Sequence, residues 1–230
     1  MFKKLSIFCL AALTSAGVVS AEESSNTEPA ESLIVYGVRL QQPATEVGSS
    51  VSILTAVDIE ALGSNYVLDA ISTLPGVTIN QNGPFGGVAT VRIRGASSEQ
   101  TLIVVDGVVV NDPTSPGGGF DFSRMDPWNI ERIEVLKGPQ STLWGTDAMG
   151  GVVNIVTKRP ENGFSRRAFA QTGSFNTFRG GAEFGAASDR YNFRLAATNT
   201  SSAGISKADE INGNTEKDGY DATTVNAAAG

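Results

Sequence analysis

The stretch Asn129–Lys158 constrains the fold of this chain more than any other segment. It contains two β-branched runs, one over Ile133–Val135 and the other over Val152–Val156. Gly138-Pro139 ends the first run, and Gly150-Gly151 precedes the second. Because β-branched residues favour strands and the Gly and Pro pairs interrupt them, the stretch predicts a strand, a short helical turn and a second strand.

Two short helices are predicted upstream, after a strand over Ser50–Leu54. Thr55 and Asp58 have the spacing of a helix N-cap with an acidic residue in the first turn, and this helix should end near Gly63. A second helix should place Val67, Ile71 and Leu74 on one face and end at Pro75-Gly76. Short helices between strands indicate an α+β domain.

Two further patterns predict strands in the same domain. Residues 88–95 alternate, with Val91 and Ile93 on one face and Arg92 and Arg94 on the other. Residues 101–110 contain Asp106-Gly107 between two valine-rich runs, which predicts a hairpin with a two-residue loop. Two glycine-rich loops, residues 81–87 and 111–120, lie around these elements, and each carries one aromatic residue.

The pattern changes after Pro160. Apolar and polar residues alternate over residues 178–186 and 191–198, with a short turn between them, and a long polar loop then covers residues 201–220. Such period-2 segments, with short turns and long loops in alternation, predict transmembrane barrel strands whose apolar face contacts lipid. A soluble antiparallel meander with one wet face is the alternative.

The N-terminus predicts export. Lys3-Lys4, an apolar run and Val19-Ser20-Ala21 form a signal peptide over residues 1–21. Its removal takes away Cys9, the only cysteine, and two of 17 basic residues, which leaves a net charge of −9 against 24 acidic residues. An acidic exported protein is a poor nucleic-acid binder, so no nucleic-acid partner is expected. Residues 22–30 are polar and predict a flexible tether.

Several catalytic chemistries are excluded by the residue types. The chain contains no histidine, which rules out histidine-based triads and histidine general bases. Gly145 and Gly150 have the spacing of a phosphate-binding loop, but Gly151-Val152 replaces the required Lys-Ser/Thr. Neither Ser97 nor Ser141 has the flanking glycines of a nucleophile elbow. We therefore expect no enzyme and no catalytic residue.

Several of these motifs resemble those of TonB-dependent outer-membrane receptors. The strongest are I-E-R-I-E-V-L-K-G-P (Ile130–Pro139), Trp144-Gly145 and A-M-G-G-V-V-N-I (Ala148–Ile155). Leu74-Pro75-Gly76-Val77, V-R-I-R-G and L-I-V-V-D-G-V have counterparts in the same family. The resemblance implies an α+β plug domain, with a small mixed sheet and short helices. It also implies that the first antiparallel strands of a transmembrane β-barrel follow, a barrel that is incomplete in this chain.

The resemblance divides the chain and assigns roles to its residues. It implies a tether over residues 22–40, a plug over 41–160 and the first ~four barrel strands over 161–230. The TonB box, which pairs with the energy-transducing TonB protein, would comprise Glu31, Ser32, Leu33, Ile34, Val35 and Tyr36. An edge strand of the plug is the alternative for this segment.

The plug loops would rise toward the outer face and bind the ligand through Asn82, Pro84, Phe85, Gly86, Asn111 and Phe120. Ionic contacts between plug and barrel would involve Arg92, Arg94, Glu131, Arg132 and Glu134. No cofactor is expected, except that Glu216 and Asp218 lie in an acidic loop that either is simply solvated or binds a structural calcium ion.

The function implied is energised uptake of a scarce large ligand across the outer membrane of a Gram-negative-type cell. Gly76–Gly83 and the short loop Gly173–Thr177 are most similar to the vitamin B12 (cobalamin) branch. A ferric-siderophore receptor is the alternative within the family. Four strands cannot close a barrel around a plug, so we expect a longer protein. A truncated, exported plug-only binding protein is the remaining alternative, and the coding frame beyond Gly230 separates the two.

Overall fold

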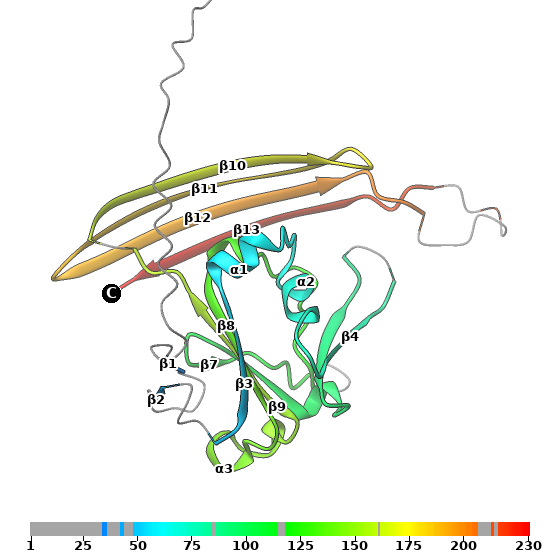
Figure 1. The fold of residues 1–230 in the computed structure, drawn as a ribbon. Coiled ribbons are helices and arrows are strands. Elements are labelled where there is room, and N and C mark those ends of the chain that lie inside the picture. Colours follow the sequence, from blue (N-terminus) through cyan, green and yellow to red (C-terminus); the bar gives the residue numbers. More distant parts are fainter. Residues whose placement is uncertain are drawn as a thin grey trace, which may run out of the picture.

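The structure is a computed structural model that describes residues 34–35, 42–43, 48–83, 86–114, 118–160, 162–206, 213 and 216–230. The predicted signal peptide and the residues Glu31, Ser32, Leu33 and Tyr36 lie outside this set. The chain forms a compact domain, here called the plug (residues 48–160), and a long curved sheet that arches over it (Figure 1).

A five-stranded sheet forms the centre of the plug. Its strand order is β3 (Ser50–Thr55), β8 (Ile130–Lys137), β9 (Gly151–Thr157), β6 (Thr101–Val105) and β7 (Val108–Val109). The β6–β9 pair is parallel and the other pairs are antiparallel, so the sheet is mixed, as predicted. β6 and β7 are joined by Asp106 and Gly107, both at positive φ, as a two-residue hairpin loop requires.

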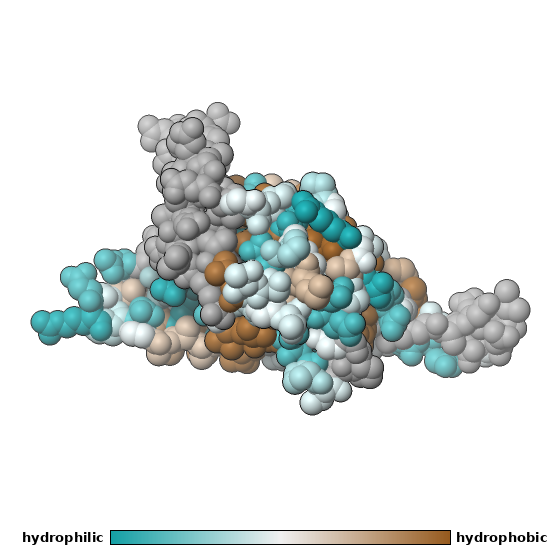
Figure 2. Space-filling model, turned by 90° about the horizontal axis from the view of Figure 1, so that it is seen from below, coloured by the Kyte–Doolittle hydropathy of each residue, from teal (hydrophilic) through white to brown (hydrophobic). Residues whose placement is uncertain are grey.

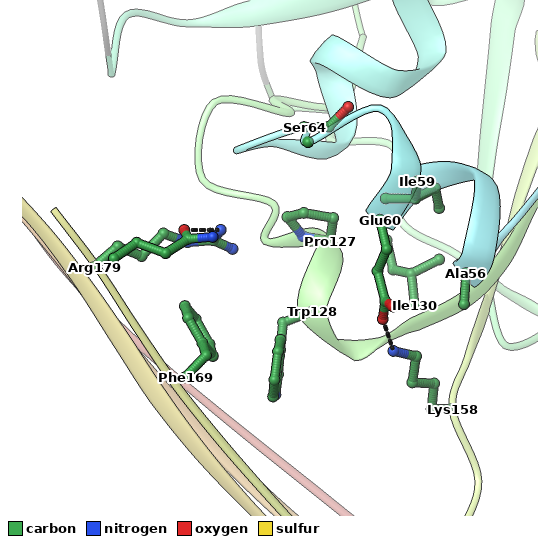
Figure 3. A pocket seen from close by; sticks show the side chains of 12 residues that line it. Ala56, Ile59, Glu60, Ser64, Pro127, Trp128, Ile130, Lys158, Phe169 and Arg179 are labelled. Carbon is green, nitrogen blue, oxygen red and sulfur yellow. Dashed lines mark hydrogen bonds and ion pairs between the residues drawn. The ribbon is translucent and has the colours of Figure 1, made fainter. Parts of the chain in front are cut away.

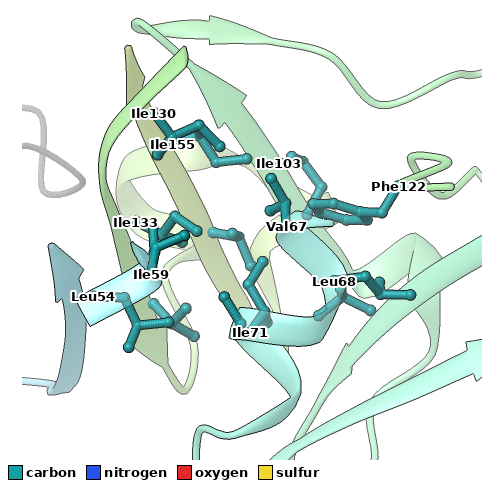
Figure 4. Packing of buried hydrophobic residues seen from close by; sticks show 14 of the residues in the cluster. Leu54, Ile59, Val67, Leu68, Ile71, Ile103, Phe122, Ile130, Ile133 and Ile155 are labelled. Carbon is teal, nitrogen blue, oxygen red and sulfur yellow. The ribbon is translucent and has the colours of Figure 1, made fainter. Parts of the chain in front are cut away.

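Both predicted helices cover one face of this sheet. α1 (Ala56–Ala61) begins at Thr55, whose side chain and that of Asp58 form a reciprocal capping box. α2 (Val67–Ser72) follows it, and the hairpin of β4 (Val77–Gln81) and β5 (Ala89–Ile93) packs beside it. Figure 4 shows Ile59, Val67 and Ile71 of the helices meeting the isoleucines of the sheet in one buried cluster.

Shorter elements complete the plug. α3 (Ser141–Trp144) and the 3-10 helix η5 (Thr146–Ala148) cover the opposite face, where Leu102, Leu136 and Val152 are buried. Two more 3-10 helices, η3 (Ser98–Gln100) and η4 (Pro127–Asn129), precede β6 and β8. The side of the plug turned away from the curved sheet mixes hydrophilic and hydrophobic residues (Figure 2).

Gly150, the first glycine of the pair in the central motif, is required for a steric reason. A Cβ on Gly150 would lie 2.5 Å from the Ala96 Cβ and 3.1 Å from the Gln100 carbonyl oxygen. The Gly150 N–H donates to that same carbonyl at 2.8 Å, so the two backbones approach closely just before β9 pairs with β6. Only glycine permits this approach.

Four long strands follow the plug. β10 (Gly163–Gly173), β11 (Thr177–Ser188), β12 (Tyr191–Ser202) and β13 (Tyr220–Ala229) form one antiparallel sheet in sequence order. Its concave side faces the plug (Figure 1). Phe184 and Leu195 on the convex side are 47% and 43% exposed, whereas Arg179 and Arg194 on the plug side are 8% and 3% exposed. The predicted alternation is therefore confirmed.

Candidate functional site

A cavity of about 390 Å³ lies between α2, the β4–β5 hairpin and the chain before η4. It is the place where the predicted ligand loop meets the helical layer. The residues around it are Asn65, Tyr66, Leu68, Asp69, Gln81, Gly83, Gly86, Ala89, Phe122 and Ser123. Of the predicted ligand residues, Gly86 lines this cavity.

The turn of the β4–β5 hairpin is set by two glycines in the left-handed region. Gly83 has φ +79° and Gly86 has φ +80°. The Asn82 N–H donates to the Val88 carbonyl at 2.9 Å, which closes the loop. Asn82 is exposed, as a ligand-contacting residue requires, whereas Pro84 and Phe85 lie outside the described residues. Ligand contact by these residues stays a prediction.

The second glycine-rich loop is tied to the plug more firmly than its sequence suggests. The Asn111 side-chain oxygen accepts from the Ile103 N–H at 2.7 Å, and its amide donates to the carbonyls of Thr101 and Gly118 at 3.1 and 3.2 Å. The ring of Phe120 packs edge-on against Phe122, with centroids 4.9 Å apart. Both side chains therefore hold the loop in place, and contact with a ligand stays a prediction.

Tyr66, the N-cap of α2, lines the cavity and interacts with Tyr220, the first residue of β13. Burial is the main reason that the pKa of Tyr66 is raised well above its ordinary value, and the neighbouring Tyr220 adds to the shift. The Tyr66 phenol is therefore neutral at physiological pH.

The plug is joined to the curved sheet by a buried ion pair. The Arg179 Nη2 lies 2.6 Å from the Asp126 Oδ1, with the two side chains 9% and 12% exposed. The same Asp126 oxygen accepts from the Trp128 N–H at 2.7 Å at the start of η4. Trp128 in turn packs against Phe169 of β10, with ring centroids 4.2 Å apart. Arg179, Trp128 and Phe169 line one part of a second cavity, of about 140 Å³, between plug and sheet (Figure 3).

A further group of charges lies beside Trp128. The Lys158 Nζ is 3.4 Å from the Glu60 Oε1, and Arg167 of β10 is 3.8 Å from the same oxygen. The pKa of Lys158 is lowered, first by burial and then by the positive charge of Arg167, while Glu60 opposes the shift. The sequence did not predict that Glu60 would meet Lys158 and Arg167, because Glu60 is too far from both along the chain for a local spacing rule to apply.

The charged residues predicted to contact the barrel lie elsewhere. Arg132 pairs with Glu131 at 2.6 Å and with the fully buried Glu134 at 2.9 Å, and Glu134 also accepts from Asn154. This cluster is internal to the plug. Arg92 and Arg94 are exposed and form no ion pair within the described part of the chain. Contacts of all five predicted residues with a barrel stay a prediction.

Two residues of the predicted TonB box form a short strand. β1 (Ile34–Val35) pairs antiparallel with β2 (Gln42–Pro43), apart from the five-stranded sheet. Of the box, the two described residues Ile34 and Val35 pair with β2 and not with the five-stranded sheet, and the role of the whole segment stays a prediction. Because Pro43 has no N–H, this two-residue ladder can form few hydrogen bonds, which leaves β1 weakly held.

The metal prediction falls on the loop before β13. Glu216 is exposed and Asp218 half-buried, and much of the loop lies outside the described residues. Within the described ranges, no three acidic, histidine or cysteine residues gather where they could hold a metal. Over the same ranges no helix combines the length and apolarity needed to cross a membrane.

Comparisons with known proteins agree with the fold. The family model of the TonB-dependent Receptor Plug Domain matches residues 43–152. The chain is 36% identical over 153 residues to the vitamin B12 transporter BtuB of Vibrio vulnificus (strain YJ016), covering 66% of this chain and 24% of that protein. It spans about a quarter of the length of the curated relatives that it matches, 24% and 25%.

Solved structures show the same architecture. The siderophore receptor PirA from Acinetobacter baumannii matches with a TM-score of 0.55 and 30% identity, over 70% of this chain and 26% of that one. The ferripyoverdine receptor of the Pseudomonas aeruginosa outer membrane matches with a TM-score of 0.63 over 74% of this chain and 23% of that one, and at 21% identity it supports the fold alone. The chain therefore belongs to the TonB-dependent receptor family, with a plug domain followed by the antiparallel strands β10–β13.

Proposed function

We propose that the protein is an outer-membrane receptor that takes up a scarce, large ligand when a TonB-type periplasmic protein moves its plug. The observation that carries this proposal is the two-sided sheet β10–β13. Its convex side exposes Phe164, Phe184 and Leu195, which suits contact with lipid. Its concave side carries Arg179, whose buried partner Asp126 belongs to the plug. A plug seated inside a lipid-facing barrel requires this arrangement.

Cobalamin is the ligand that we propose. The curated relatives that match at 36% and 35% identity are vitamin B12 transporters. The cavity beside the β4–β5 hairpin, together with the exposed Asn82, offers the ligand a surface at the end of the plug where β13 begins (Figure 1). A ferric siderophore is the second candidate, because a siderophore receptor matches at 30% identity.

The weak pairing of β1 supports a role as the TonB-binding segment. Its backbone can leave β2 at small cost and add as a strand to a partner sheet, which is a common mode of peptide recognition. The predicted signal peptide and tether would deliver this segment to the periplasm. A calcium ion held by Glu216 and Asp218 remains part of the proposal.

Equilibrium binding to purified full-length protein tests the ligand. We expect saturable binding of cyanocobalamin and no competition from a panel of ferric siderophores. Binding of a ferric siderophore alone would assign the protein to the second class, and binding of neither would refute both. Repeating the titration with calcium and then with a chelator shows whether the acidic loop contributes.

A further inference from the structure

The ring of Tyr220 lies so close to residue 86 that only a glycine fits at that position. A Cβ built on Gly86 would lie 2.6 Å from the Tyr220 Cδ2 and 2.8 Å from its Cε2. The ring therefore occupies the space that a side chain at residue 86 would fill. Gly83, three residues earlier, has almost the same φ but nothing within 4 Å of its Cβ position.

The same tyrosine also reaches the helical side of the cavity. Its phenol lies close enough to the Tyr66 phenol to help raise the pKa of Tyr66. Tyr66 and Gly86 both line the 390 Å³ cavity, one from the N-cap of α2 and the other from the hairpin loop. One side chain of β13 thus packs against Gly86 on one wall of the cavity and interacts electrostatically with Tyr66 on the other.

We propose that Tyr220 is a positioning residue for ligand binding, which fixes Gly86 of the β4–β5 hairpin relative to α2 and so sets the shape of the cavity. This inference rests on the proposed function for its ligand but not for its geometry. Its physical basis is that an aromatic ring packed against Gly86 leaves the backbone at this residue few alternative conformations. Pre-organisation of this kind lowers the conformational cost of binding.

The two glycines supply a matched pair of variants. Gly86→Ala and Gly83→Ala carry the same cost of an alanine at positive φ, but only the first displaces Tyr220. In full-length protein in lipid nanodiscs, we expect amide exchange of residues 77–93 to be about tenfold faster in Gly86→Ala than in Gly83→Ala. In a Tyr220→Ala background the two glycine variants should become equal, because the displaced ring is gone.

A ligand arm tests whether this positioning matters for binding. We expect Tyr220→Ala to raise the dissociation constant of cyanocobalamin about tenfold without changing the number of binding sites. Tyr220→Phe keeps the ring against Gly86 and should raise the dissociation constant less. If the alanine variant fails to assemble, Tyr220→Phe takes its place in the binding experiment. Absence of cyanocobalamin binding in the unaltered protein would refute the proposed ligand, and the exchange arm would still decide the geometry.

Three results would overturn the inference. Equal exchange in Gly86→Ala and Gly83→Ala, with Tyr220 present, would show that the ring does not fix the loop. Exchange unchanged by Tyr220→Ala would show the same. Faster exchange in Tyr220→Ala with an unchanged dissociation constant would make the contact purely structural.

Discussion

The ion pair between Asp126 and Arg179 should contribute substantially to holding the plug against the sheet. Asp126→Asn removes the charge but keeps a side-chain oxygen that can still cap η4, since asparagine is a good N-cap residue. Arg179→Met removes the guanidinium and keeps an apolar stem beside Phe169, over whose ring the guanidinium lies at 5.1 Å. The two changes therefore isolate the ion pair from its neighbours.

The magnitude follows from distance and burial. Charges about 4 Å apart attract by about 4 kcal/mol at an effective dielectric constant of roughly 20. Desolvation of two side chains that are 9% and 12% exposed offsets part of this attraction. We expect a coupling free energy of about 2 kcal/mol in a double-mutant cycle, within the range of about 1.5–7 kcal/mol for close, buried pairs.

Local unfolding of the plug within the full-length protein provides the assay. A cysteine at the fully buried Ala70 is labelled by a maleimide only when α2 opens, and its labelling is followed against urea concentration. Each single variant should lower the urea midpoint, and the double variant should lower it by less than the sum. A coupling free energy below about 0.5 kcal/mol, the range of distant sites, would refute the reasoning.

Two other predictions use the same assay. Phe120→Ala should destabilise the plug by about 1–3 kcal/mol, because the ring packs on Phe122, and an unchanged midpoint would contradict this packing. The lowered pKa of Lys158 means that the unfolded state binds more protons, so its contribution to stability rises with pH up to its ordinary pKa of 10.5. Lys158→Met should flatten that rise relative to the unaltered protein, and parallel pH profiles would refute the assignment.

Local rules predicted most of the fold. The capping box at Thr55, the Asp106-Gly107 hairpin and the alternation over residues 178–198 each follow from chemistry within a few residues, and the structure confirms them. The central motif was predicted as strand, helical turn and strand, which α3 and η5 between β8 and β9 confirm.

The contacts that make the candidate site could not be predicted in the same way. Asp126 and Arg179 are separated by 53 residues, and which of many charges would meet depends on how the sheet crosses the plug. Phe120 resembled an exposed loop aromatic, and only the packing of the whole loop reveals that it joins the core. Gly86 was predicted as a ligand residue, yet its contact with Tyr220 requires the β4–β5 hairpin and β13 to be placed together.

Energised uptake by cells carrying a Val35→Pro variant tests the central claim most directly. The substitution removes a backbone N–H from β1 and fixes φ near about −65°, which should prevent strand addition to a TonB-type partner. Val35→Ala keeps that donor, and Gln42→Pro alters only the pairing strand β2. We predict that Val35→Pro abolishes cyanocobalamin uptake while ligand affinity and outer-membrane abundance stay normal, and that both controls retain uptake. Normal uptake by Val35→Pro would contradict the account.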